Sequence, residues 1–284
     1  MTPTTDPAPH LSGYLLIDSL NLPSSLDCDP LPIRVCVPSD LTNIVSLLPG
    51  LVSIEALNVD QLVILREIMQ LQTEGRHPWA ICAVITSDVG MEDLIKHICS
   101  LLSITDGDDR PVLWRFFDPR VFSLVMAIYS DEQRKKLLGP IREWRFPWRG
   151  HWWSVIGEHY ESKPLDNFDT VLPNKAQWMI LKLSKILDQV LLKVEQKNLL
   201  STSACLDLQE KALVLLQEGS SEMNFSEPSE LTDYAYCGVY YGAPFLLHSK
   251  FQNAKADLAI GALNWWEFKE SFDFDTLLPK RKDI

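Results

Sequence analysis

Asp118 and Arg120 are the residues whose types and spacing best suit an active site. They lie on either side of Pro119 in the stretch RFFDPRVF, residues 115–122. A carboxylate beside a guanidinium can act as a general acid or base in a hydrolase, because the nearby cation sets the charge of the acid. The stretch is therefore either catalytic or a boundary between two structural elements.

The neighbours of Asp118 favour the boundary. A strand-like aromatic run precedes it, and the apolar residues within 121–128 follow at helical spacing. An aspartate at the N-cap accepts hydrogen bonds from backbone N–H groups that lack helical partners, and a proline at the first helical position lacks the N–H that would be wasted there. We expect Asp118 to cap a helix that begins at Pro119. Arg120 should then have a specific partner, because the helix dipole disfavours a cation in the first turn.

Gly139 and Pro140 end the next predicted helix. The stretch LLGPIREW, residues 137–144, follows a helical pattern over 131–138. Glycine adopts the left-handed conformation that closes a helix, and proline cannot continue one. We expect both residues to be structural.

The segment WRFPWRGHWW, residues 144–153, combines four tryptophans with two arginines. Tryptophan and arginine anchor protein interfaces, and aromatic rings also stack on single-stranded bases. We expect packing between two lobes first, a protein partner second and nucleic acid third, because the chain is acidic. The candidate partner-binding residues are Arg120, Arg142, Trp144, Arg145, Trp148, Arg149, Trp152 and Trp153.

The charge of the chain is uneven. The formal net charge is −12 at pH 7, which argues against general binding to nucleic acid or to an anionic membrane. Between residues 110 and 150, however, nine cations face four anions, a net charge of +5. This basic segment could dock an acidic partner, or it could be neutralised by the protein's own surface.

No other pattern indicates a catalytic, metal or cofactor site. The histidines and cysteines lack metal-ligand spacing, and there is no phosphate-binding glycine loop or nucleophile elbow. We therefore expect no enzyme activity, no metal and no cofactor. The polar N-terminus and the lack of an apolar run of about 20 residues predict a soluble cytoplasmic protein with reduced cysteines.

The elements that must position these residues fall into two lobes. Strand and helix patterns alternate over roughly the first 150 residues, which predicts an α/β or α+β lobe with a central sheet flanked by helices. Strand patterns include 13–18, 80–85 and 111–117, whereas helical patterns dominate from 174 onward, beginning with 174–196. The predicted organisation is a flexible N-terminus at 1–12, an α/β lobe at 13–160, a linker at 161–173 and a helical lobe at 174–284.

Four stretches together resemble the bacterial type VI secretion effector-adaptor family. They are YLLID, which ends in Asp18, DLIKHICSLL, which contains His97, VLWRFFDPRVF and LLGPIREW. The specific part is the pair of FFDPRV, in place of the family's F-x-[FY]-D-P-R-V segment, and Gly-Pro-Ile about twenty residues later. The family's His-Leu-Arg reads His97-Ile98-Cys99 here, so the role of that arginine is absent or moved. The structural motif residues are Asp18, His97, Asp118, Pro119, Gly139 and Pro140.

The resemblance implies a non-enzymatic chaperone. Such adaptors bind the N-terminal part of a toxic effector in the bacterial cytoplasm and deliver it to a VgrG spike, without a cofactor and without binding nucleic acid or membrane. The resemblance covers roughly residues 13–150, and the helical remainder is similar only in pattern. Two alternatives stay open: a hydrolase that uses Asp118 and Arg120, and single-stranded nucleic-acid binding through Trp144–Trp153.

Overall fold

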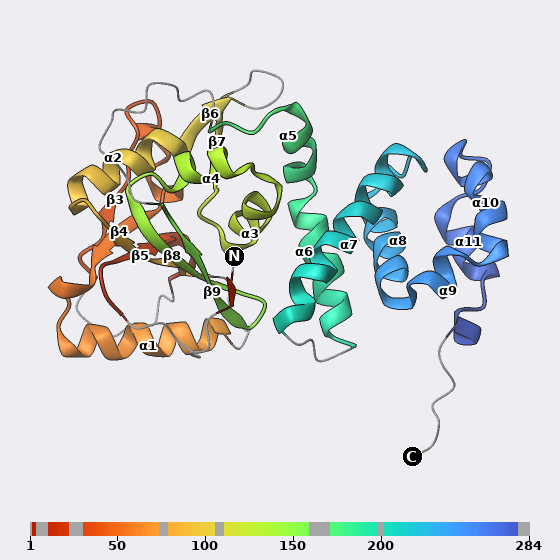
Figure 1. Cartoon of the computed structure of the whole chain (residues 1–284), viewed down its shortest axis with the longest axis horizontal. Coiled ribbons are helices and arrows are strands. Elements are labelled where there is room, and N and C mark those ends of the chain that lie inside the picture. Colours follow the sequence, from red (N-terminus) through yellow and green to blue (C-terminus); the bar gives the residue numbers. More distant parts are fainter. Residues whose placement is uncertain are drawn as a thin grey trace, which may run out of the picture. The chain divides into compact units, whose positions relative to one another are not determined.

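The chain divides into two compact units, Met1–Leu181 and Lys182–Ile284, in a computed structural model (Figure 1). The structure describes residues 2–3, 11–22, 31–73, 79–105, 111–158, 171–197 and 202–277. The first unit contains an antiparallel sheet flanked by helices and the second is mainly helical, which confirms the predicted fold class. The expected linker at 161–173 lies largely outside the described residues, so the domain boundaries stay a prediction.

The first unit is built on one antiparallel sheet. In the described part of the chain, seven strands pair in the order β1-β9-β8-β5-β2-β4-β3. A separate ribbon pairs β6 with β7. The strand bounds are β1 Thr2–Pro3, β2 Tyr14–Ile17, β3 Arg34–Val35, β4 Gly50–Ser53, β5 Ile81–Ser87, β6 Ser103–Thr105, β7 Pro111–Leu113, β8 Ile141–Trp148 and β9 His151–Ile156.

Helices cover both faces of this sheet. Helix α1 (Val59–Thr73) lies along one face, whereas α2 (Met91–Leu102), α3 (Pro119–Ile128) and α4 (Asp131–Leu138) lie on the other (Figure 1). A core cluster joins residues of α1, such as Leu65 and Ile68, to Leu15 and Trp152 of the sheet. The remaining elements among the described residues of this unit are α5 (Lys175–Lys182) and the 3₁₀ segments at Ser19–Asn21, Thr42–Leu47 and Ile54–Ala56.

The predicted strand over 111–117 is shorter than expected, since β7 ends at Leu113. The backbone then turns, and the Asp118 N–H donates to the Arg115 carbonyl over 3.1 Å. Phe116 and Phe117 are both buried, although neighbours in a strand point to opposite faces. The turn allows both rings to enter the core.

The tryptophan-rich segment forms the hairpin β8–β9. Trp148 pairs with His151, so Arg149 and Gly150 make a two-residue turn with φ values of 52° and 72°. Positive φ at both positions is the mark of a type I′ turn, whose twist matches that of antiparallel strands. The sequence analysis missed this hairpin, because arginine is an unusual residue at the first turn position.

The second unit is a bundle of helices with an aromatic core. Its elements are α6 Ser184–Glu195, α7 Thr202–Ser221, α8 Pro228–Tyr241, α9 Ala243–Leu246, α10 Ser249–Ala259, α11 Trp265–Ser271 and a 3₁₀ segment at Phe274–Leu277. Tyr234 and Trp265 are fully buried, and their rings pack edge to face with centroids 5.5 Å apart. The helix expected over 174–196 is in fact two helices, because the helix is interrupted at Leu183, between α5 and α6.

Two cysteines distant in the sequence come together in the first unit. Cys36 is buried and Cys99 is partly exposed, and each thiol shifts the pKa of the other. The neighbouring thiol of Cys99 and burial raise the pKa of Cys36, whereas the thiol of Cys36 lowers the pKa of Cys99. Nothing in their sequence spacing indicates the pair.

The ring of His97 packs against Gly139. The ring of His97 is buried, and its Nε2 lies 2.9 Å from the carbonyl oxygen of Leu137 at the end of α4. Gly139 follows with φ of +50°, and a Cβ there would lie 2.4 Å from Cε1 of His97. Glycine is therefore needed both for the backbone conformation and for the space that the ring fills. The structural role predicted for both residues stays a prediction, and this packing supports it.

We expect Gly139→Ala to lower the free energy of unfolding by about 1–3 kcal/mol, because the backbone is strained at positive φ and the imidazole must move. Urea denaturation followed by tryptophan fluorescence measures the change. Gly90→Ala is the matched control, since a Cβ at Gly90 meets nothing within 4 Å. Equal losses for the two variants would contradict this role of Gly139.

The buried His97 should also make stability depend on pH. Burial lowers its pKa from the ordinary value of 6.5, so the unfolded chain binds a proton more readily than the folded one. The stability contribution is complete above pH 6.5 and is lost as the pH falls toward the depressed folded pKa. His97→Gln should flatten the pH profile of the unfolding free energy in this range. An unchanged profile would show that a group other than His97 causes the pH dependence of stability.

Candidate partner-binding site

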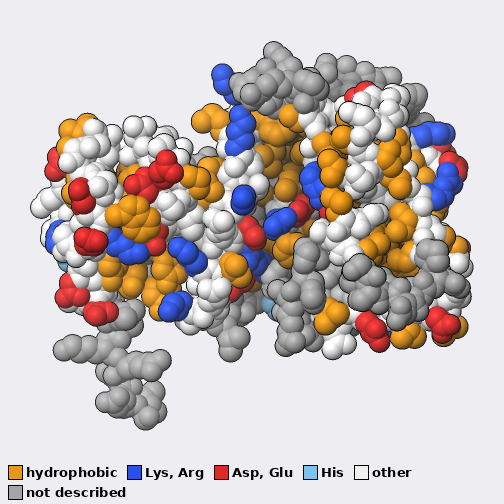
Figure 2. All heavy atoms as spheres, turned by 180° about the vertical axis from the view of Figure 1, so that it is seen from behind, with side chains coloured by type: hydrophobic (Ala, Val, Ile, Leu, Met, Phe, Trp, Pro, Cys, Tyr) orange, Lys and Arg blue, Asp and Glu red, His pale blue; other side chains and the backbone are white. Residues whose placement is uncertain are grey.

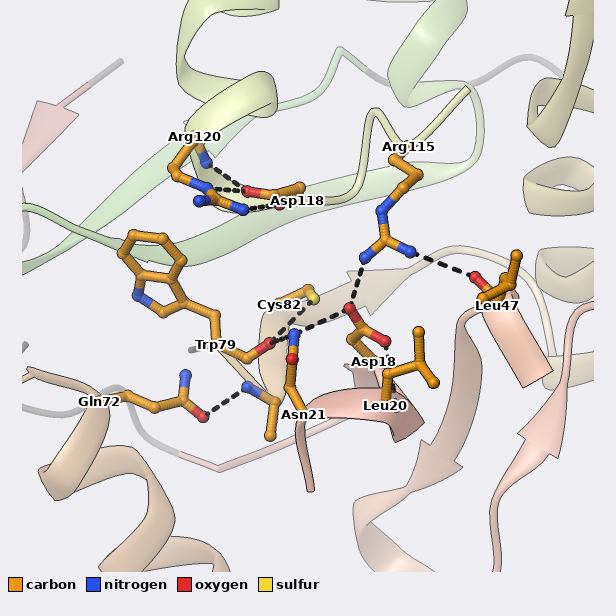
Figure 3. A network of polar contacts seen from close by, with 11 residues as sticks. Asp18, Leu20, Asn21, Leu47, Gln72, Trp79, Cys82, Arg115, Asp118 and Arg120 are labelled. Atoms are coloured by element: carbon orange, nitrogen blue, oxygen red, sulfur yellow. Dashed lines mark hydrogen bonds and ion pairs between the residues drawn. The ribbon is translucent and has the colours of Figure 1, made fainter. Parts of the chain in front are cut away.

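Asp118 is the N-cap of α3. Its Oδ1 accepts from the backbone N–H of Arg120 over 3.0 Å, and Pro119 is the first helical residue, as predicted. The Arg120 side chain returns to the same carboxylate, with Nε 3.0 Å from Oδ1 and Nη2 2.6 Å from Oδ2 (Figure 3). The specific partner expected for Arg120 is therefore Asp118 itself.

This arrangement holds the acid in place. Both oxygens of Asp118 accept hydrogen bonds from Arg120, and the guanidinium also lies over the ring of Trp79 at 5.3 Å. The geometry is that of a helix cap reinforced by an ion pair.

A second acid–arginine pair lies beside the first. Asp18 follows β2 with 3% of its side chain exposed, and its Oδ2 is 2.5 Å from Nη2 of Arg115. The Asp18 carboxylate also accepts from the backbone N–H of Leu20 over 3.2 Å and from the amide of Asn21 over 3.0 Å. A buried carboxylate is tolerated only when such partners satisfy its charge.

This network joins segments that are far apart in the sequence (Figure 3). Asn21 also donates to the carbonyl oxygen of Trp79 over 3.1 Å, just before β5. Arg115 reaches the carbonyl oxygen of Leu47 over 3.4 Å and lies over the ring of Phe117 at 5.0 Å. The end of β2, the start of β5 and the turn before α3 are thereby fixed to one another around Asp18.

The basic segment over 110–150 is largely neutralised by acids of the same unit. Seven of its nine cations form ion pairs in the part of the chain that the structure describes. The pairs are Arg115–Asp18, Arg120–Asp118, Arg134–Asp131, Lys135–Glu158, Lys136–Glu132, Arg142–Asp88 and Arg145–Glu143. Of the two interpretations of this segment, the structure favours neutralisation by the protein's own surface.

The four tryptophans of the hairpin are core residues. Trp144, Trp148, Trp152 and Trp153 are each exposed by 2% or less. Trp144 stacks on Phe122 of α3 with centroids 4.5 Å apart, and Trp153 donates to the carbonyl oxygen of Trp148 over 2.8 Å. This burial corrects the expectation of a binding surface, because no indole offers a face to a protein partner or to a base. The ring contacts of Trp144 with Phe122 and of Trp148 with Trp153 join residues of the first unit.

The arginines predicted to bind a partner differ in accessibility. The side chain of Arg120 is 44% exposed and that of Arg142 is 58% exposed, the latter paired with Asp88. Arg145 is mostly covered and lies 2.6 Å from Glu143. This ion pair lowers the pKa of Glu143, and the hydroxyl of Ser154 also donates to that carboxylate over 2.7 Å. Arg149 is partly buried in the hairpin turn.

The described residues contain no group of three or more histidines, cysteines or acids that could hold a metal ion. None of the helices described here is long and apolar enough to cross a membrane.

The matched part of the chain contains the capping motif. Residues 38–136 match the family model of a domain of unknown function (DUF4123). The match covers less than half of the 284 residues and runs through α1 to α4, so it includes His97 and the whole stretch FFDPRV. Asp18 and the pair Gly139–Pro140 lie outside it. No curated protein and no solved structure matches the chain.

The sequence predicted Asp18, Asp118 and Arg120 of the network in Figure 3 but not its other members, among them Asn21, Trp79 and Arg115. Arg115 was counted only as one cation among nine. A single sequence does not reveal that Arg115 pairs with an acid 97 positions away. Asn21 contributes its side-chain amide and Trp79 its backbone carbonyl oxygen. Neither contact can be recognised from the types of the residues in the sequence.

The two acid–arginine pairs should differ in their effect on stability. Arg115→Gln leaves the Asp18 carboxylate buried without its cation, so we expect a loss of about 3–5 kcal/mol in the free energy of unfolding. Asp118→Ala removes a helix cap and leaves an accessible arginine, so we expect a loss of about 1 kcal/mol. Urea denaturation of both variants measures which of them loses more free energy of unfolding.

Lys135→Gln serves as the control, because it breaks the exposed pair with Glu158 and should change stability by less than about 0.5 kcal/mol. If Asp118→Ala cost more than Arg115→Gln, the buried pair would not be the dominant interaction.

Proposed function

We propose that this protein is a non-enzymatic adaptor of bacterial type VI secretion. It binds the N-terminal region of a cognate effector in the cytoplasm and loads that effector onto a VgrG spike. The adaptor needs no cofactor for this task and contacts neither nucleic acid nor membrane.

The observation that carries the proposal is the FFDPRV stretch within the matched domain. The domain match spans residues 38–136, and the stretch at residues 116–121, taken together with Gly-Pro-Ile, is the specific part of the resemblance to effector adaptors. The Gly-Pro-Ile segment follows at residues 139–141, in the order that the resemblance requires.

The state of Asp118 and Arg120 also supports a binding protein over a hydrolase. The carboxylate caps α3 and accepts both guanidinium bonds from Arg120. The motif is then explained by its effect on the fold.

We propose a division of labour between the two units. The motifs are concentrated in the first unit, which suits a partner common to many adaptors, such as the spike. The helical unit, which carries none of these motifs, binds the cognate effector and provides the specificity for it.

Affinity purification of the tagged full chain from its native host tests the proposal. We expect mass spectrometry to find one large toxin-like protein and a VgrG protein, and we expect both to stay bound after nuclease treatment. Deletion of the gene should stop delivery of that effector while the spike is still assembled. The same tag on an unrelated protein of similar charge is the control. Recovery of nucleic acid alone, or of neither partner, would contradict the proposal.

A further inference from the structure

The second unit contains a groove between α7 and the joined helices α8 and α9. Its volume is about 640 Å³. Residues at positions 207, 210, 211, 214, 215 and 218 of α7 line one wall, and this spacing places them on one face of the helix. Val214 on this face is 58% exposed. One stripe of α7 therefore lacks a cover among the described residues.

The opposite wall is made of small residues. Gly238 lies in α8, and a Cβ there would be 2.7 Å from Cδ1 of Leu215, so glycine allows the two helices to approach closely. Gly242 has φ of +60°, and a Cβ at that position would meet nothing within 4 Å. Gly242 and Ala243 leave the groove open beside the apolar side chains of Val239 and Leu246.

Charge at the groove is negative. Three acids, Asp207, Glu210 and Glu218, and one cation, Lys211, line it. Glu218 is neutralised by Lys255 at 2.6 Å and also accepts from the hydroxyl of Tyr234 over 2.9 Å. Asp207 and Glu210 are therefore the acids that a ligand of positive charge would meet.

Hydrophobic side chains also reach the surface elsewhere on this unit. They lie among acidic and basic groups on the face seen at the left of Figure 2. Leu247 and Ile260 are 75% and 80% exposed. Scattered apolar residues of this kind are ordinary on a protein surface. The groove differs from them because its apolar residues line one concave surface and have acidic residues beside them.

We propose that this groove binds an amphipathic helix of the effector. The apolar face of that helix lies on Val214, Leu215 and Leu246, and its lysines or arginines lie next to Asp207 and Glu210. A helix in a groove places anchors at every third or fourth residue, which matches a groove that follows one face of α7. This inference rests on the proposed function and names the chemistry of the effector segment.

A synthetic peptide tests the chemistry of the groove. The probe is a fluorescent 18-residue helix with leucines on one face and lysines on the other, and its isomer has glutamate in place of every lysine. Fluorescence anisotropy measures binding of each peptide to the full chain. We expect the lysine peptide to bind and the glutamate peptide not to bind. Equal binding of both would overturn the charge complementarity.

Three variants localise the binding. Val214→Lys places a charge on the apolar floor and should weaken binding by about tenfold, a typical effect for a central contact. Glu210→Lys should weaken it by several-fold at low salt. Gln217→Lys is the matched control, because it adds the same charge as Val214→Lys at an exposed position of α7 outside the groove lining. Equal affinities of Val214→Lys and Gln217→Lys would overturn the proposal.

Purification from the native host separates this inference from the proposed function. If wild type retains an effector and Val214→Lys loses it while Gln217→Lys does not, the groove is supported. If all three chains retain the effector equally, the groove is excluded and the adaptor function stands. If wild type retains no effector, the adaptor function fails, and the peptide measurement alone decides whether the groove binds a basic helix.

Discussion

The ion pair between Asp18 and Arg115 is the interaction on which the first unit depends. The carboxylate is removed from water, and its charge is met by one guanidinium and by the donors of Leu20 and Asn21. Breaking such a pair leaves a buried charge that costs several kcal/mol. The turn before α3 therefore cannot move away from the end of β2 unless the acid is exposed to water.

This constraint gives the motif FFDPRV a physical meaning. Phe116 and Phe117 enter the core from a turn, Asp118 caps α3, and Arg120 closes on the cap. These residues of the motif contact their own chain, so the contacts of the motif are explained by the fold. The open apolar groove lies instead in the helical unit, on a helix rich in acids.

Local signals in the sequence predicted local structure. The cap at Asp118, the helix end at Gly139 and the buried strand β5 follow from residue types within one turn or one strand. The burial of the tryptophans, the Arg115–Asp18 pair and the Cys36–Cys99 contact depend on residues brought together by the fold. A single sequence carries no signal for such pairings. The type I′ turn at Arg149 was missed because arginine gives no indication of positive φ.

Hydrogen–deuterium exchange of the full chain, alone and in the complex purified from its native host, tests the central claim most directly. That claim is that the motif residues support the fold and that recognition takes place on the helical unit. Exchange should slow on binding in peptides covering residues 207–246 and stay unchanged over 115–122. Slower exchange confined to residues 115–122 and 141–153 would contradict the claim and make the motif itself the binding surface.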